Sequence, residues 1–282
     1  MSKFMSKILF LDDFLLHQVQ GGAELNNNEL VTLLTERGWD VEHKQSHSVN
    51  RGDIEHADYI IVSNFANLQS EFVNRIINSL KPYIIYEHDH KYLISRNPAG
   101  YKSFIAPASE IVNFQFYKNA RSVVCQTRFH FDIVKNNLKL DNIVNLGGNL
   151  WPVSILDSLA SLSKIEKKNT HSIMDSRIDH KNTAGAIKFC KTKGLAYELI
   201  PNSPTPQFLK LLAKNKNFVF FPKTPETLSR VVVEARMLGC TVVTNNLVGA
   251  TGEPWFLKKG LELIEHFLDE RSRIPGVIED AF

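Results

Sequence analysis

The chain alternates short apolar runs with stretches of helical spacing, and this alternation limits its fold more than any other feature. In the first half, the apolar, β-branched or aromatic runs occupy residues 7–11, 41–44, 59–62, 83–86 and 123–126. The stretch 23–37 carries leucines at helical spacing and ends before Gly38. Short strands that alternate with helices predict a parallel, doubly wound α/β sheet.

A second series of the same kind follows. Its predicted strands are 172–174, 197–200, 218–221 and 241–244, and its predicted helices are 182–193, 207–214 and 228–238. The stretch 150–168 is first amphipathic and then charged, as is typical of a crossing between domains. We therefore predict Rossmann-like domains at 1–150 and 151–255, and a C-terminal helix and tail at 256–282 that packs back toward the first domain. The predicted apolar stripe of that helix contains Leu257, Leu261, Ile264 and Leu268.

Composition excludes several classes of protein. No apolar run approaches the ~20 residues that span a bilayer, and the chain starts without the apolar region of a signal peptide. The three cysteines, Cys125, Cys190 and Cys240, are too widely spaced for a metal-binding pattern, so we expect reduced thiols in a cytoplasmic protein. A net charge of +3 does not by itself indicate a polyanionic partner.

Two glutamates flank the start of the predicted helix 228–238. The apolar run before this helix is the predicted strand 218–221, so Glu226 is expected just past its carboxyl end. Open α/β sheets bind ligands at this end of their strands. Glu234 follows eight residues later, inside the helix. Between them we expect the backbone amides of Thr227, Leu228 and Ser229 to open the helix and form an anion site. This order of acceptor, amides and acceptor suits a nucleotide sugar. In the alternative interpretation, Glu234 is an exposed helix carboxylate and Glu226 a first-turn capping charge.

Four elements of the sequence resemble the GT-B glycosyltransferases of the large retaining family 4. They are 21–24 (Gly-Gly-Ala-Glu), 176–181 (Ser-Arg-Ile-Asp-His-Lys), the pair Glu226 and Glu234, and 245–250 (Asn-Asn-Leu-Val-Gly-Ala). The resemblance implies two domains that face a cleft, with the donor bound mainly by the C-terminal domain and the acceptor by the N-terminal domain. It also implies retaining transfer without a metal, and no cofactor besides a nucleoside diphosphate sugar, with UDP-sugar expected.

The same resemblance implies roles for individual residues. Arg177 and Lys181 would face the diphosphate and stabilise the leaving group. Glu234 would accept hydrogen bonds from the ribose, and Glu226 from the transferred sugar. Ser176 stands where the family has a glycine, a departure that would narrow the phosphate pocket. The full set expected to bind the donor is Gly21, Gly22, Ser176, Arg177, Lys181, Glu226, Thr227, Leu228, Ser229 and Glu234.

The two glycines would let the backbone approach a ligand closely, because no Cβ intrudes. Gly21 and Gly22 follow the first predicted strand, and a simple turn is the alternative for them. We expect Glu24 to cap its own helix.

A cluster of titratable residues ends the predicted strand 83–86. The family often has a histidine near the anomeric centre at this strand end, so His88 is expected to take part in catalysis with Arg177, Lys181 and Glu226. His90 is the alternative to His88. A metal site is not expected, because neighbours in one strand cannot all converge on an ion.

The segment 91–139 is rich in cations and aromatic rings, a combination typical of nucleic-acid contact. The alternative is a solvated basic surface over an aromatic core. The residues expected to contact the acceptor substrate are Asp89, His90, Arg96, Lys102 and Lys118. Compact phage GT-B enzymes that glycosylate modified DNA bases are similar in size, which keeps DNA open as the acceptor.

Three functions therefore follow from the sequence. The first is a glycosyltransferase with a glycan or polysaccharide-precursor acceptor. The second is the same enzyme class acting on a hydroxylated pyrimidine in DNA. The third is a binding protein for nucleotide sugars that has lost catalysis. The residue types leave the nucleotide, the sugar and the oligomeric state open.

Overall fold

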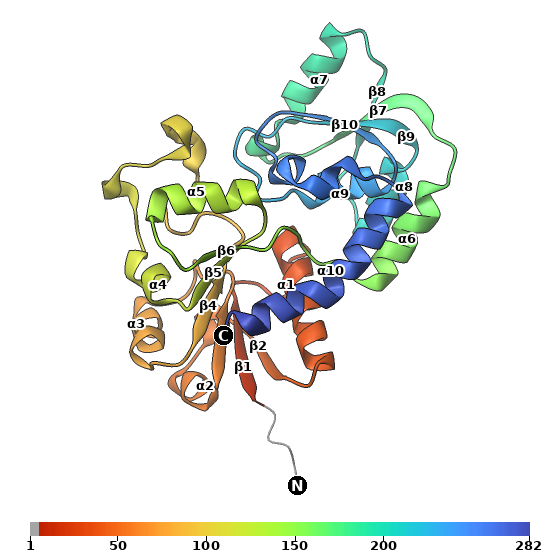
Figure 1. The fold of residues 1–282 in the computed structure, drawn as a ribbon. Coiled ribbons are helices and arrows are strands. Elements are labelled where there is room, and N and C mark those ends of the chain that lie inside the picture. Colours follow the sequence, from red (N-terminus) through yellow and green to blue (C-terminus); the bar gives the residue numbers. More distant parts are fainter. Residues whose placement is uncertain (1–5) are drawn as a thin grey trace. The chain divides into compact units, whose positions relative to one another are not determined.

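The computed structural model describes residues 6–282, which divide into two compact units (Figure 1). Among these residues, the first unit consists of 6–150 and Arg271–Phe282, and the second of Trp151–Glu270. The chain start on which the signal-peptide expectation partly depends, residues 1–5, lies outside the described residues.

The first unit is a parallel six-stranded sheet in the order β2-β1-β3-β4-β5-β6. Its strands are β1 (Lys7–Asp12), β2 (Asp40–Gln45), β3 (Tyr59–Val62), β4 (Tyr83–Tyr86), β5 (Ser122–Cys125) and β6 (Ile143–Asn145). Its helices are α1 (Gly22–Glu36), α2 (Arg51–His56), α3 (Ser70–Asn78), α4 (Phe114–Asn119), α5 (Arg128–Leu138) and the last part of α10 (Leu261–Asp280).

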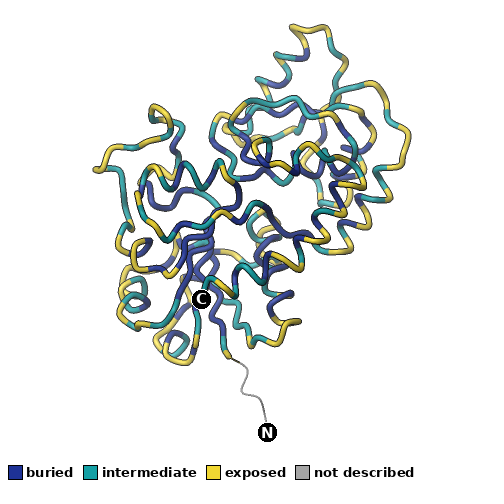
Figure 2. Tube along the Cα trace, viewed as in Figure 1, coloured by how far each residue is buried: buried dark blue, intermediate teal, exposed yellow. Residues whose placement is uncertain are grey.

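Helices cover both faces of this sheet, and its inner strands β1, β3, β4 and β5 are largely buried (Figure 2). Successive side chains of β1 enter opposite cores, because residues of a strand point alternately to its two faces. Leu9 and Leu11 pack in a core that contains residues of α2, α3, α4 and α5. Ile8 and Phe10 pack in the other core, with α1 and the end of α10.

The second unit has a parallel four-stranded sheet in the order β10-β9-β7-β8. Its strands are β7 (Lys168–Met174), β8 (Tyr197–Ile200), β9 (Asn215–Phe220) and β10 (Thr241–Thr244). Its helices are α6 (Val153–Ser163), α7 (Thr183–Thr192), α8 (Thr205–Leu212), α9 (Arg230–Met237) and the first part of α10. The larger core lies against α6, α8, α9 and α10, and a smaller core lies against α7.

The predicted α/β class with parallel sheets is confirmed, and the predicted strands 59–62, 83–86, 197–200 and 241–244 agree with β3, β4, β8 and β10 end to end. Of the predicted stripe of the last helix, Ile264 is buried, whereas Leu257, Leu261 and Leu268 are exposed. Leu257 is 88% exposed because the helix starts only at Leu261, and the buried side chains of its first turns are Leu263, Ile264 and Phe267.

Candidate active site

In the second unit, two predicted site residues that are far apart in sequence contact each other. Lys181 ends a short 3-10 turn, Asp179–Lys181, in the loop after β7, and Glu226 lies in the loop after β9. The Lys181 ammonium lies 2.8 Å and 3.0 Å from the two carboxylate oxygens of Glu226. Both side chains are largely buried, at 24% and 13% exposed. The pair therefore sits at the carboxyl ends of adjacent parallel strands, the position at which such sheets bind ligands.

Backbone contacts hold the two loops together. The Asn182 side chain donates to the carbonyl of Phe221 at 2.8 Å, and Asn182 also caps α7 by accepting from the amide of Gly185. The amide of Lys223 donates to the carbonyl of His180 at 2.8 Å. The position of Lys181 relative to the loop after β9 is thus fixed from both sides.

The loop 245–250 fixes Glu226 in turn. The Glu226 amide donates to the carbonyl of Leu247 at 2.7 Å, and its carbonyl accepts from the amide of Gly249 at 2.9 Å. This glycine-bearing loop was one of the four elements of the resemblance, and it serves as a backbone partner of the first glutamate.

The start of α9 differs from the prediction. The helix begins at Arg230, so Thr227 and Leu228 precede it and do not open it. Ser229 is the residue before the first helical position and has a left-handed backbone, with φ of 74°. The Leu228 carbonyl accepts from Ala250 at 3.2 Å, which draws this stretch toward the loop 245–250 and delays the helix.

Glu234 is buried within the unit and is not the exposed helix carboxylate of the alternative interpretation. Its Oε1 accepts from the indole Nε1 of Trp151 at 2.9 Å, and the Arg230 guanidinium stacks on that indole at 4.1 Å. Burial raises the pKa of the Glu234 carboxyl. A ribose could be bound only by the part of this carboxylate that Trp151 leaves open, and the ribose role stays a prediction.

Ser176 and Arg177 lie in the loop after β7. Arg177 is exposed, and among residues 6–282 its side chain has no hydrogen bond or ion pair. The Ser176 amide donates to the hydroxyl of Thr183 at 3.1 Å, so the backbone of this residue is tied to the start of α7. The structure therefore joins Lys181 to Glu226 and leaves Arg177 extended toward solvent.

In the first unit, the loop after β1 leads into the start of α1. Gly21 precedes the first helical residue, Gly22. A Cβ on Gly21 would lie 2.2 Å from Oε2 of Glu24, so glycine is needed there for the Glu24 side chain to fold back over the helix start. This position agrees with the expected capping role of Glu24. Burial raises the pKa of the Glu24 carboxyl.

His88 follows β4 and is held by two amide side chains. Its Nε2 lies 2.7 Å from Oδ1 of Asn27, and its Nδ1 lies 2.6 Å from the side-chain nitrogen of Gln126. Asn27 donates to Asp12 at 2.7 Å, which turns its oxygen toward His88. Gln126 accepts from Asn149 at 3.3 Å, which turns its nitrogen toward the ring. These contacts favour a neutral imidazole with the proton on Nε2.

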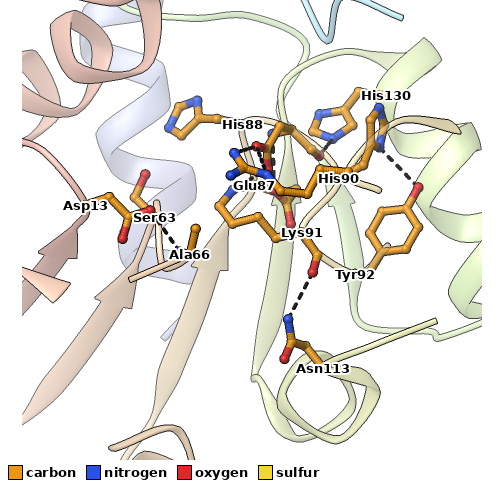
Figure 3. A network of polar contacts seen from close by, with 12 residues as sticks. Asp13, Ser63, Ala66, Glu87, His88, His90, Lys91, Tyr92, Asn113 and His130 are labelled. Atoms are coloured by element: carbon orange, nitrogen blue, oxygen red, sulfur yellow. Dashed lines mark hydrogen bonds and ion pairs between the residues drawn. The ribbon is translucent and has the colours of Figure 1, made fainter. Parts of the chain in front are cut away.

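His90 lies in the interior, 2% exposed, where its Nδ1 contacts the Tyr92 hydroxyl at 3.1 Å (Figure 3). Its ring meets that of buried His130 edge to face at 5.3 Å. Burial lowers the pKa of His90 to about 4 and keeps its ring neutral. Of the two alternatives, His88 is the one whose side chain borders a cavity, so the structure favours His88 for contact with a substrate.

A buried ion network lies beside His88 (Figure 3). The Lys91 ammonium lies 2.7 Å from Glu87 and 2.6 Å from Asp89, and Asp89 also binds the Arg96 guanidinium at 3.0 Å. The Tyr117 hydroxyl donates to Glu87. Burial raises the pKa of Glu87 to about 7, whereas the cations on either side lower the pKa of Asp89.

The segment 91–139 is not a surface of stacking rings. Its eight aromatic side chains are buried or half-buried, and Tyr92, Phe116 and Tyr117 belong to the core. Several cations already hold carboxylates, as Arg128 does with Asp132. Lys102 and Lys118 are exposed. The segment is therefore better described as a basic surface over an aromatic core than as a set of exposed rings that stack on nucleic-acid bases.

Four residues that shape the two sites are not predicted from the sequence: Asn27, Gln126, Asn149 and Trp151. The only signal for the first was three consecutive asparagines, 26–28, on a helix with an apolar face. Asn26 and Asn27 are fully buried, and a buried polar side chain needs partners that only the fold supplies.

Within residues 6–282, no helix is both long and apolar enough to cross a membrane. In the same residues, no group of three or more His, Cys, Asp or Glu side chains is arranged to hold a metal ion. The three cysteines are free and buried.

No protein-family model matches the sequence, and no curated protein matches it. Solved structures do match along nearly the whole chain. Anabaena Alr3699/HepE, in complex with UDP and glucose, is 16% identical with a TM-score of 0.56, over 98% of this chain and 92% of that one. The catalytic domain of Starch Synthase IV from Arabidopsis thaliana, bound to ADP and acarbose, is 8% identical with a TM-score of 0.58, over 98% and 95%. An alpha-glucosyltransferase in complex with UDP and a 13-mer DNA containing a HMU base is 11% identical with a TM-score of 0.55, over 96% and 91%.

These likenesses define the class of fold: the chain has the GT-B fold of glycosyltransferases. At such low identity they establish the fold alone, and the chemistry has to be argued from the residues described above.

Proposed function

We propose that the chain is a retaining glycosyltransferase that moves a sugar from a nucleoside diphosphate sugar, with UDP-sugar as the expected donor, to a hydroxyl acceptor. The observation that carries this proposal is the contact between Lys181 and Glu226 at the carboxyl ends of β7 and β9. On a GT-B fold, a cation and a hydrogen-bond acceptor at this place suit the diphosphate and the sugar of such a donor.

In this proposal the charge that develops on the departing diphosphate is met by protein cations. Lys181 supplies a point charge and exposed Arg177 a planar fork that can close on the phosphates. Glu226, released in part from Lys181 as the phosphates arrive, accepts hydrogen bonds from the sugar hydroxyls. Retention of configuration is proposed on the resemblance, with the acceptor hydroxyl entering on the face that the leaving group vacates.

His88 is proposed to contact the reacting sugar from the first unit. Its neutral ring presents a polarised N–H, because Gln126 donates to its other nitrogen. Asn27 occupies that N–H in the structure described here, so a sugar hydroxyl would replace or join an existing acceptor. The proposed acceptor is a glycan or a glycan precursor bound by the first unit.

The proposal is tested with a panel of nucleoside diphosphate sugars. Binding is measured by thermal stabilisation of the chain, and turnover by release of the free nucleotide with and without acceptors. We expect a UDP-sugar to stabilise the chain and to be turned over slowly by hydrolysis. Tight binding with no turnover toward any acceptor would instead favour a binding protein that has lost catalysis.

DNA is retained as a second acceptor because Lys102 and Lys118 are exposed cations in the first unit. Duplex binding measured at low salt decides the matter, since phosphate contacts weaken steeply with salt. No affinity for duplex DNA at low salt would remove this alternative.

A further inference from the structure

One cavity of the first unit is not explained by donor binding. It measures about 600 Å³ and is bordered by α3, by α4 and by the segment between Lys91 and Arg96. A volume of this order is typical of small-molecule sites, which take ~300–1,000 Å³. Most of its lining residues are apolar, among them Phe65, Leu93 and Phe114, and uncharged polar side chains such as Asn74 and Gln115 also border it.

The charges at the border of this cavity are already neutralised. Lys91 holds Glu87 and Asp89, and its ammonium lies 5.5 Å from the centre of the Phe65 ring. Arg96 holds Asp89 from the other side. Among the described residues that line the cavity, none is acidic. The lining therefore suits an uncharged apolar group and offers little to an anion or a cation.

A smaller cavity of about 370 Å³ lies next to it, and the two share Ala66 and Arg96 as lining residues. The wall of the smaller one carries the titratable side chains His88, Glu24 and Asp13. Asp13 accepts from the amide of Ala66 at 2.8 Å, so the shared wall is fixed to the end of β1 (Figure 3). One ligand could thus place a hydroxyl-bearing group beside His88 and an apolar group in the larger cavity.

We propose that the acceptor is amphipathic: it carries an uncharged apolar portion, an alkyl chain or an aromatic ring, that binds between α3 and α4 while its sugar or hydroxyl lies beside His88. This inference rests on the proposed function, which it narrows from any hydroxyl acceptor to one with an apolar aglycone. A plain glycan would leave the larger cavity unfilled.

The experiment compares octyl β-glucoside, 4-nitrophenyl β-glucoside and methyl β-glucoside as ligands of the full chain without donor. Dissociation constants are measured by calorimetry, and contact of the aglycone is measured by saturation-transfer NMR. We expect the octyl or the nitrophenyl compound to bind at least about tenfold more tightly than the methyl compound, which equals about 1.4 kcal/mol. A preference for one of the two apolar compounds distinguishes a chain from a ring as the natural group.

Two variants of α3 locate the site. Asn74 is exposed and lines the larger cavity, so Asn74→Trp should fill the entrance and abolish the preference for apolar aglycones. Asn78 is exposed on the same helix and lines only a separate surface hollow that Asn74 also borders, so Asn78→Trp should leave the preference intact.

Equal binding of all three glucosides, or an equal effect of the two variants, would overturn the inference. Donor hydrolysis is measured in parallel and separates this failure from that of the proposed function. Hydrolysis without an aglycone preference would refute only the amphipathic acceptor. An aglycone preference without any donor turnover would refute the transferase and leave a binding site for apolar glycosides.

Discussion

Replacing Lys181 by alanine separates its structural role from its chemical one. Its contacts of 2.8 and 3.0 Å with Glu226 are partly shielded from water. At an effective dielectric constant of about 20, charges about 4 Å apart attract by roughly 4 kcal/mol. Desolvation and the ordering of two side chains offset most of that attraction, so partly exposed pairs contribute about 1 kcal/mol or less. We therefore expect Lys181→Ala to lower the free energy of unfolding by no more than about 1 kcal/mol.

The expected loss of turnover is larger. A group that stabilises charge in the transition state contributes about 10²–10³ in rate, or roughly 3 kcal/mol. Urea denaturation measures the first quantity, and release of UDP from a saturating UDP-sugar measures the second. The matched control is Lys223→Ala, because Lys223 forms an exposed ion pair of 2.7 Å with Asp179 on the neighbouring loop. If Lys181→Ala and Lys223→Ala turn over donor equally well, the assignment of Lys181 to the diphosphate is refuted.

Three further changes test other parts of the two units. His88→Ala should lower donor turnover about five- to tenfold, since one hydrogen bond to substrate contributes about 1–1.5 kcal/mol, and an unchanged rate in the UDP-release assay would contradict the role of His88. Lys91→Met leaves Glu87 without its cation and should cost about 3–5 kcal/mol near pH 8, measured by urea denaturation. The pKa of Glu87 is raised from 4.5 to about 7 already in the wild type, so the stabilisation from its neutral form is present below 4.5 and lost as the pH rises through 7. The cost of Lys91→Met should therefore shrink toward about pH 5, and a cost independent of pH would argue against a charged Glu87 at neutral pH. Trp151→Phe removes the donor to buried Glu234 and should cost about 1–3 kcal/mol in the same denaturation experiment, whereas a neutral effect would mean that water replaces the indole.

Part of the candidate site was predictable because parallel topology dictates it. Lys181 and Glu226 follow β7 and β9, which are neighbours in the sheet, so both loops emerge at the same edge. The apolar runs that define these strands are visible in the sequence, and their order follows from strand–helix alternation. The topology predicts only that the two loops share an edge, and the structure adds that the two side chains are in contact. Their roles toward a donor stay predictions.

Other features depended on packing that residue types do not record. The three-residue strand β6 is too short to show a period. The start of α9 is set by the contact of Leu228 with Ala250, between segments that a sequence pattern does not connect. Likewise, Asn27 and Gln126 orient His88 from α1 and from the end of β5, and neither stands near it in the sequence.

The segment 91–139 illustrates why charge in a sequence does not predict charge at a surface. Lys91 is 3% exposed and is neutralised by two carboxylates, Glu87 and Asp89, which both lie outside the segment. Arg96, counted as a candidate contact for DNA, shares Asp89 with Lys91. The contacts that neutralise these cations also lie in the wall between the His88 cavity and the larger cavity. This segment therefore attracts a polyanion less strongly than its sequence suggests, whereas the two cavities offer a site to an uncharged acceptor. Glycoside binding should accordingly depend on the aglycone and only weakly on salt.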